Sequence, residues 1–186
     1  MKIKNLTKSF DKKLIFDNFS VEFPENEVTY VMGESGCGKT TLLRIIAGID
    51  NDFSGEIEAL PNNISYVFQE PRLFPNLNVI KNIELVNDTP VYSASELLNL
   101  LELGNEELTM PSKLSGGMKM RLSLARALYH NGDVYLMDEP FSALDQDMKN
   151  RLIPKVLELL KGKTVIIVSH DIDEAKKYAD KIITLA

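Results

Sequence analysis

Short apolar runs rich in β-branched residues recur along this chain, and they alternate with longer segments whose apolar residues have helical spacing. Each run has the length and composition of a buried strand. The predicted strands are residues 28–32, 64–68, 134–137 and 164–169. The predicted helices are residues 40–47, 95–103, 118–129 and 148–160, with a last helix after Asp171. This alternation predicts an α/β fold with a mostly parallel, doubly wound sheet.

Two stretches depart from the alternation. Residues 13–23 mix alternating and β-prone positions, and a turn signal follows at residues 24–27. The stretch of about residues 70–132 holds prolines at positions 71, 75, 90 and 111 and has apolar residues at helical spacing over 95–103. Gly104 is expected to stop that helix. We interpret this stretch as a small helical insertion. Without repeats or linkers, the sequence predicts one domain over residues 1–186.

The balance of charges disfavours a nucleic-acid partner. The chain carries 27 Asp and Glu against 21 Lys and Arg, a formal net charge of −6, whereas binding to phosphate backbones depends on basic patches. The N-terminus has no apolar signal segment, and no apolar stretch approaches the roughly 20 residues of a membrane span. The sequence therefore predicts a soluble, cytosolic chain without a nucleic-acid partner.

A glycine-rich segment follows the first predicted buried strand. Residues 33–40 match the phosphate-binding loop (P-loop) pattern G-x-x-x-x-G-K-[ST], with a strand before the loop and a helix after it. Glycines let successive backbone N–H groups face phosphate oxygens, and the helix N-terminus favours negative charge. A turn into a helix would not require the pair Lys39–Thr40, which suits phosphates and Mg²⁺. The expected nucleotide-binding residues are Gly33, Glu34, Ser35, Gly36, Cys37, Gly38, Lys39, Thr40 and Thr41.

Cys37 is the chain's single cysteine, so it forms no internal disulfide, which fits a reducing compartment. Its place near a helix N-terminus could lower its thiol pKa and make it redox-sensitive. The simpler interpretation is that a small residue fills this position.

Two acids end the strand predicted over 134–137. Parallel strands deliver such residues to the carboxyl edge of the sheet, where ligands of these folds bind. Asp138 is suited to hold Mg²⁺ opposite Thr40, and Glu139 to polarise a water for attack on the γ-phosphate. Alone, the two acids could equally be a solvated loop. The phosphate-binding loop upstream makes the catalytic interpretation stronger.

The motif Leu114-Ser-Gly-Gly-Met118 lies between the phosphate-binding loop and the two acids. With these motifs in this order, the chain resembles the ATP-binding cassette (ABC) ATPases from Phe10 to Asp180. The resemblance implies a P-loop NTPase core with a mostly parallel sheet, an N-terminal antiparallel β-subdomain and a small helical insertion. It also implies ATP and Mg²⁺ as cofactors.

The resemblance implies roles for further matched residues. Phe10 would stack on adenine, where the family often has Tyr, although a core aromatic is an alternative. Gln69 would sense Mg²⁺ and the attacking water, and His170 would contact the γ-phosphate and orient that water. The plainer alternatives are an exposed amide and a helix-capping residue, but Asp171-x-x-Glu174 already supplies a cap for the last helix.

The family closes two nucleotides between two head-to-tail chains. The resemblance therefore implies that Ser115, Gly116, Gly117 and Asp145 contact the nucleotide of the other subunit or lie at that interface. The partner chain could be identical or a different ATPase. The expected catalytic residues are thus Glu139, His170 and Gln69, and the expected metal ligands are Thr40, Gln69 and Asp138.

Several segments, including Ser-Gly-Gly-Met118, are most similar to the nitrate, sulfonate and taurine importer ATPases, although the family more often has Gln at this position. This subgroup implies a permease partner, an extracytoplasmic solute-binding protein and a place on the cytoplasmic face of the membrane. Phe74 and Leu77 are candidates for a groove on this chain that docks the coupling helix of the permease, or for core packing. The insertion looks short for the subgroup. Alternatives are an ATPase for lipoprotein release, cell division or export, a switch module with little turnover, and a DNA-repair ATPase.

Overall fold

The structure, a computed structural model, describes residues 1–11 and 13–185. A central sheet has the strand order β5-β6-β7-β3-β8, and every neighbouring pair is parallel. Its strands are β3 (Val28–Met32), β5 (Ile64–Val67), β6 (Val134–Asp138), β7 (Thr164–Val168) and β8 (Lys181–Thr184). The predicted parallel sheet is therefore confirmed, and its carboxyl edge carries the loops that follow β3, β6 and β7.

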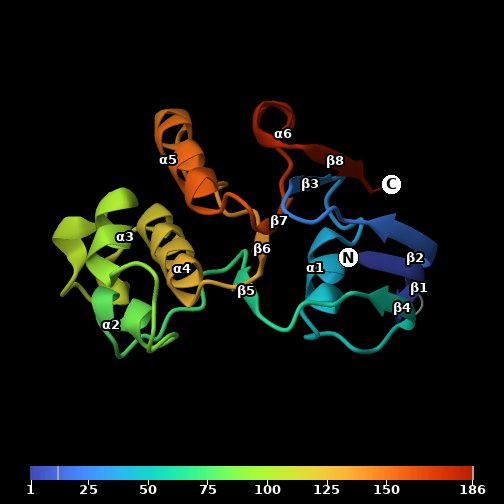
Figure 1. Cartoon of the computed structure of the whole chain (residues 1–186), viewed down its shortest axis with the longest axis horizontal. Helices are drawn as coiled ribbons and strands as arrows, with labels where there is room; N and C mark the ends of the chain where they lie inside the picture. Colours follow the sequence, from blue (N-terminus) through green and yellow to red (C-terminus); the bar gives the residue numbers. More distant parts are fainter. Residues whose placement is uncertain (12, 186) are drawn as a thin grey trace.

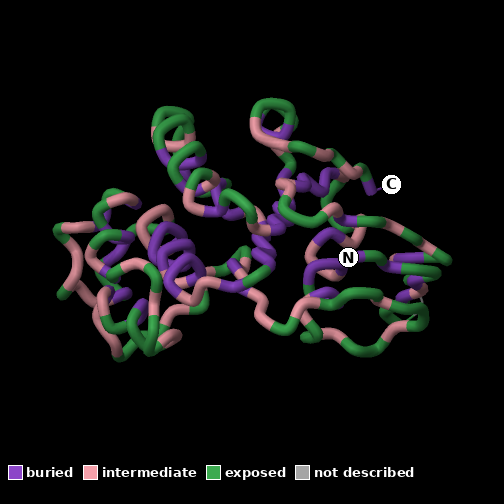
Figure 2. The backbone as a smooth tube through the Cα atoms, viewed as in Figure 1, coloured by how far each residue is buried: buried purple, intermediate pink, exposed green. Residues whose placement is uncertain are grey.

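Both faces of this sheet are buried, which explains why its strands are apolar without interruption. Successive side chains point to opposite faces, so Leu136 and Ile166 join one core while Met137 and Ile167 join another. The buried positions run through β6, β7 and α4 (Gly116–His130) (Figure 2). The sheet thus separates two hydrophobic cores and fixes the positions of the residues at its carboxyl edge.

A second, antiparallel sheet has the order β2-β1-β4. It consists of β1 (Lys2–Phe10), β2 (Lys13–Glu22) and β4 (Ser54–Glu58). Buried residues such as Leu6 and Phe16 pack with Leu42 of α1 (Lys39–Ile46) in the second core. This packing places the end of β1 and the start of β2 beside the phosphate-binding loop.

The helical insertion forms a separate lobe, on the left in Figure 1. Helices α2, α3 and α4 contact one another there, and α4 also packs against β5. The remaining helical elements are α2 (Val79–Glu84), α3 (Ala94–Leu100), η1 (Gly104–Glu106), η2 (Pro111–Lys113), α5 (Gln146–Leu159) and α6 (Ile172–Tyr178). No helix within residues 1–11 and 13–185 has the length and apolarity needed to cross a membrane.

The predicted end of α3 is wrong. This helix starts with a capping box between Ser93 and Glu96, but it ends at Leu100, because Glu102 adopts a left-handed conformation with φ 57°. Gly104, the predicted stop, instead begins the short helix η1. The separate strands β1, β4 and β8 and the helix α2 had no predicted boundaries. All four are partly exposed, and β4, β8 and α2 are also short.

Candidate active site

The phosphate-binding loop connects β3 to α1. Gly38 caps α1 with φ 105°, and a Cβ atom there would lie 2.6 Å from Ile15 Cγ2 and 2.8 Å from the Phe16 ring. Gly33 also has a positive φ, and a Cβ there would lie 2.7 Å from the Leu185 carbonyl oxygen. These two positions need glycine both for conformation and for space. The loop is therefore wrapped tightly at the end of the strand.

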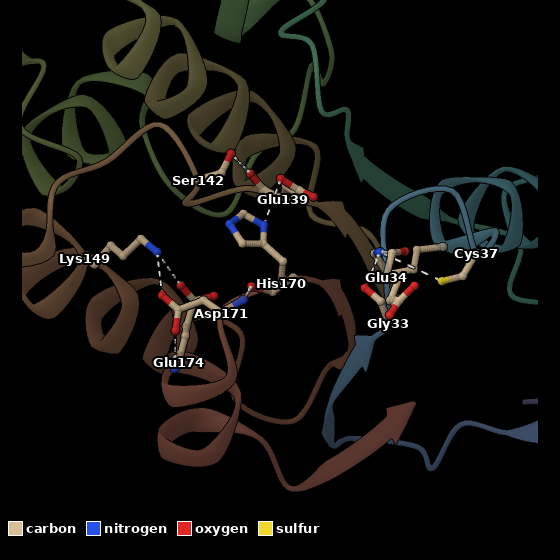
Figure 3. Close-up of polar contacts among 11 residues, drawn as sticks. Gly33, Glu34, Cys37, Glu139, Ser142, Lys149, His170, Asp171 and Glu174 are labelled. Carbon is tan, nitrogen blue, oxygen red and sulfur yellow. Dashed lines mark hydrogen bonds and ion pairs between the residues drawn. The ribbon is translucent and has the colours of Figure 1, made fainter. Parts of the chain in front are cut away.

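Lys39 lies in the first turn of α1 and is buried. Its ammonium group donates hydrogen bonds to the carbonyl oxygens of Gly33, at 2.7 Å, and Glu34, at 2.8 Å (Figure 3). The Cys37 sulfur lies 4.0 Å from the same nitrogen. The lysine charge is thus held inside the curve of the loop, where a phosphate group would meet it.

A cavity of about 560 Å³ opens over the loop. It combines residues from the loop, from the first β-hairpin and from the carboxyl edge of the sheet. Its lining consists of Phe10, Ile15, Gly33, Ser35, Gly36, Gly38, Lys39, Thr40, Thr41, Gln69, Glu139, Val168 and His170. Eleven of the predicted site residues therefore share one cavity, with a volume suited to a small ligand.

Glu34 and Cys37 face a different side of the loop. They line a second, more open cavity of about 920 Å³, together with Leu14, Ile172 and Ile182. Their contribution to a phosphate site would come from the loop backbone, because their side chains do not line the first cavity.

Asp138 is the last residue of β6 and is buried. Burial raises the pKa of its carboxyl group, which a hydrogen bond with the Thr40 side chain partly offsets. A hydroxyl oxygen and a carboxylate oxygen at contact distance are hard ligands of the kind that Mg²⁺ prefers, with water and phosphate completing its shell. Among the described residues, no group of three or more His, Cys, Asp or Glu side chains is placed to hold a metal ion.

Glu139 lies at the turn after β6, with its backbone in the left-handed region at φ 51°. Its N–H donates to the Val168 carbonyl at 3.0 Å, and its carbonyl accepts from the backbone N–H and the hydroxyl of Ser142. Its carboxylate lies 3.4 Å from Nδ1 of His170, which follows β7 (Figure 3). Three backbone and side-chain bonds therefore hold a strained turn that directs this carboxylate to the cavity.

Gln69 and Phe10 complete the rim of the cavity. Gln69 is exposed directly after β5, and Phe10 ends β1 with 47% of its surface exposed. The buried ammonium group of Lys8 lies 4.6 Å from the centre of the Phe10 ring. This exposed ring, supported from one side, is available to a flat ligand, and it does not belong to the core.

Four predicted residues lie away from this cavity. Ser115 caps α4 by accepting a hydrogen bond from the Met118 N–H, and Asp145 caps α5 in the same way. Both are exposed, as is Gly116, and Gly117 is half-buried. Within one chain, Ser115, Gly116, Gly117 and Asp145 do not join the phosphate-binding loop.

The prediction missed two residues that line the cavity, Ile15 and Val168. Both are apolar residues of strands, and the sequence carries no signal that separates them from core positions. Pairing of Phe10 with Lys13 in the first hairpin is what brings Ile15 to the loop.

The chain is similar to known proteins in sequence. The family model described as ABC transporter matches residues 16–142. An aliphatic sulfonates import ATP-binding protein from Pseudomonas syringae pv. tomato is 36% identical over 189 residues, covering 100% of this chain and 82% of the relative. An Fe(3+) ions import ATP-binding protein from Haemophilus influenzae is 37% identical over 206 residues, covering 97% of this chain and 57% of the relative.

Solved structures are similar as well. The dimeric structure of a bacterial ABC transporter cassette matches with a TM-score of 0.86 and 31% identity, covering 99% of this chain and 93% of that one. A dimeric post-hydrolysis state of an ATP-binding cassette, bound to ADP and phosphate, matches with a TM-score of 0.83 and 30% identity over the same shares. The chain therefore belongs to the ABC transporter family and is one of its ATPases.

Proposed function

We propose that this chain is the ATP-binding and hydrolysing subunit of an importer and that it couples MgATP to solute transport through a membrane permease. The observation that carries the proposal is the convergence of Lys39, Thr40, Gln69, Glu139 and His170 on one cavity. The importer assignment is supported by relatives whose names describe import of aliphatic sulfonates and of Fe³⁺. Because those solutes differ, specificity resides in other subunits.

The chemistry is phosphoryl transfer to water. In such reactions, positioning and electrostatic stabilisation supply most of the catalysis. Lys39 and the loop N–H groups bind the phosphates, and Phe10 stacks on the adenine. Glu139 polarises the attacking water, and His170 orients it beside the γ-phosphate. The 3.4 Å approach of these two side chains supports their acting on the same water.

The expected metal is Mg²⁺, held by Thr40, Asp138 and Gln69. When bound, it would neutralise charge on the phosphate oxygens. The contact between Asp138 and Thr40 supports this donor set, as does the burial of the Asp138 carboxyl group.

We also propose a functional dimer. Ser115, Gly116, Gly117 and Asp145 are exposed or half-buried and lie outside the chain's own cavity, which supports their acting on the nucleotide of a second chain. The dimeric cassette structures that this chain resembles support the same arrangement. A single chain would then hold an incomplete site.

The permease would dock against the helical lobe of this chain. Phe74 is 43% exposed and packs on Arg126. This exposure supports a role for Phe74 in a groove of this chain that docks the permease. Leu77 is half-buried, and its N–H donates to the Phe74 carbonyl at 3.2 Å. Docking there places the chain on the cytoplasmic face of a membrane, with an extracytoplasmic solute-binding protein as a further component of the system.

The direct test is phosphate release from ATP by the purified chain, with Mg²⁺ and with a chelator. We expect Mg²⁺-dependent turnover that falls about 100-fold or more in Glu139→Gln, with ATP binding retained. Equal turnover in Glu139→Gln would contradict the role of Glu139. ATP binding without turnover in the wild type would favour a switch module, and absent ATP binding would contradict the proposal altogether.

A further inference from the structure

A partly buried ionic cluster joins α5 to α6 beside His170 (Figure 3). The ammonium group of Lys149 lies 2.9 Å from Asp171 Oδ2 and 3.2 Å from Glu174 Oε2. The side chains are 14%, 27% and 4% exposed in that order. At this depth a charged group needs a partner, so the cluster strongly favours one arrangement of the two helices.

Asp171 has two roles in this cluster. Its Oδ1 accepts the Glu174 N–H at 3.0 Å, which caps α6, while its Oδ2 binds Lys149. Its own N–H donates to Ser169 Oγ at 3.1 Å. These contacts fix the residues on both sides of His170. The hydrogen bonds from the Glu174 N–H and from Lys149 lower the pKa of Asp171, so the carboxylate stays charged.

The predicted capping box of α6 is only half formed. Asp171 caps the helix as expected, but the Glu174 carboxylate turns to Lys149. The Glu174 carboxylate is 4% exposed and takes part in neither the cap nor the first cavity. Its contact with a residue of α5 indicates that it secures α6 against that helix.

Lys149 lies four residues after Asp145, in the first turns of α5. Its N–H donates to the Asp145 carbonyl at 2.9 Å. One side chain therefore connects the start of α5, which bears a proposed interface residue, to the turn that presents His170 to Glu139.

We infer that Lys149 is a positioning residue for His170: through Asp171 and Glu174 it holds the imidazole beside Glu139. Lys149 does not line the cavity and touches no reacting atom. This inference rests on the proposed function of His170. Loss of Lys149 would lower the rate of the chemical step and leave nucleotide affinity unchanged.

The test compares Lys149→Met with Lys177→Met. Lys177 also joins α6 to α5, through Asn150 Oδ1 at 3.2 Å, but it is exposed and does not contact Asp171. We expect Lys149→Met to lower kcat about tenfold at unchanged KM, because small misplacements of a positioned group are costly. Lys149→Arg should recover most of the rate, and Lys177→Met should match the wild type.

Two further readouts separate positioning from general destabilisation. In a His170→Gln background, Lys149→Met should cause no additional loss of kcat. The chain has only two histidines, so the imidazole NMR signal of His170 can be assigned with His170→Gln. Lys149→Met should move that signal in the nucleotide-free protein and leave the signal of His130 in place.

The inference is overturned if Lys149→Met and Lys177→Met agree in kcat and in the His170 signal, or if Lys149→Met lowers kcat equally in the His170→Gln background. If Lys149→Met does not fold, Asp171→Asn replaces it, since Asn keeps the cap and loses the charge. A wild type without turnover would contradict the proposed function, and the NMR comparison would still test the role of Lys149.

Discussion

His170 Nδ1 lies 3.4 Å from Glu139 Oε2, and this contact joins the loops after two neighbouring strands of the central sheet. The imidazole is 69% exposed, whereas the carboxylate is 21% exposed. The histidine therefore depends on its loop for position and remains accessible to a ligand in the cavity.

The first prediction concerns this histidine. We expect His170→Ala to lower ATP turnover by about 10²-fold or more, because the water loses its orienting group. ATP affinity, measured by calorimetry, should change little, since the loop around Lys39 is intact. Turnover near the wild-type rate would show that Glu139 acts without His170.

A second prediction concerns stability and pH. A hydrogen bond from Lys8 lowers the pKa of Asp50, whose carboxylate lies 2.8 Å from that buried ammonium group. A lowered pKa stabilises the fold fully above the unfolded-state value of about 3.9, and this stabilisation is lost as pH falls through the folded-state pKa. Asp50→Asn should therefore lower the urea midpoint at neutral pH.

The difference in urea midpoint between Asp50→Asn and the wild type should disappear once the pH falls below the folded-state pKa of Asp50. Asp52→Asn is the matched control, because Asp52 Oδ2 lies 3.4 Å from the same Lys8 nitrogen but its side chain is 97% exposed. It should change the midpoint little at any pH. A difference for Asp50→Asn that persisted in strong acid would mean that the ion pair is not its cause.

Gly38 provides a third prediction. In Gly38→Ala, the new Cβ would meet Ile15 at 2.6 Å, in addition to the strain of φ 105°. We expect a loss of about 2–3 kcal/mol in the free energy of unfolding. Gly48 is the control, since it also has a positive φ but no atom within 4 Å of its Cβ position. An equal loss of unfolding free energy in Gly48→Ala would show that backbone strain accounts for the whole effect.

Phe10 provides a fourth prediction. Loss of its ring should weaken ATP binding about tenfold, the range expected for aromatic stacking on a base. Phe10→Tyr keeps the ring face and should bind ATP as the wild type does. Inorganic tripolyphosphate should bind Phe10→Ala and the wild type equally, because it lacks a base. Weaker binding of both ligands would instead indicate a rearranged hairpin.

Much of this site was predictable because its motifs are local. The phosphate-binding loop needs consecutive residues between a strand and a helix, so spacing alone placed Lys39 and Thr40. Asp138 and Glu139 followed from an apolar strand that ends in acids. The resemblance to a family then added Phe10, Gln69 and His170, which the structure places on the same cavity.

The remainder depends on contacts between distant segments. Ile15 reaches the cavity through hairpin register, and Lys149 meets Glu174 through the packing of two helices. Neither relationship leaves a pattern in the local sequence. The end of α3 was missed for a different reason, because Glu102, and not a glycine, adopts the left-handed conformation that stops the helix.

We propose that two chains close on MgATP and hydrolyse it. The most direct measurement is the solution mass of Glu139→Gln by light scattering, with MgATP and then with MgADP. Because this variant should bind ATP without hydrolysing it, we predict a dimer with MgATP and a monomer with MgADP. A monomer in both, despite measured ATP binding, would contradict a site shared between two copies of this chain.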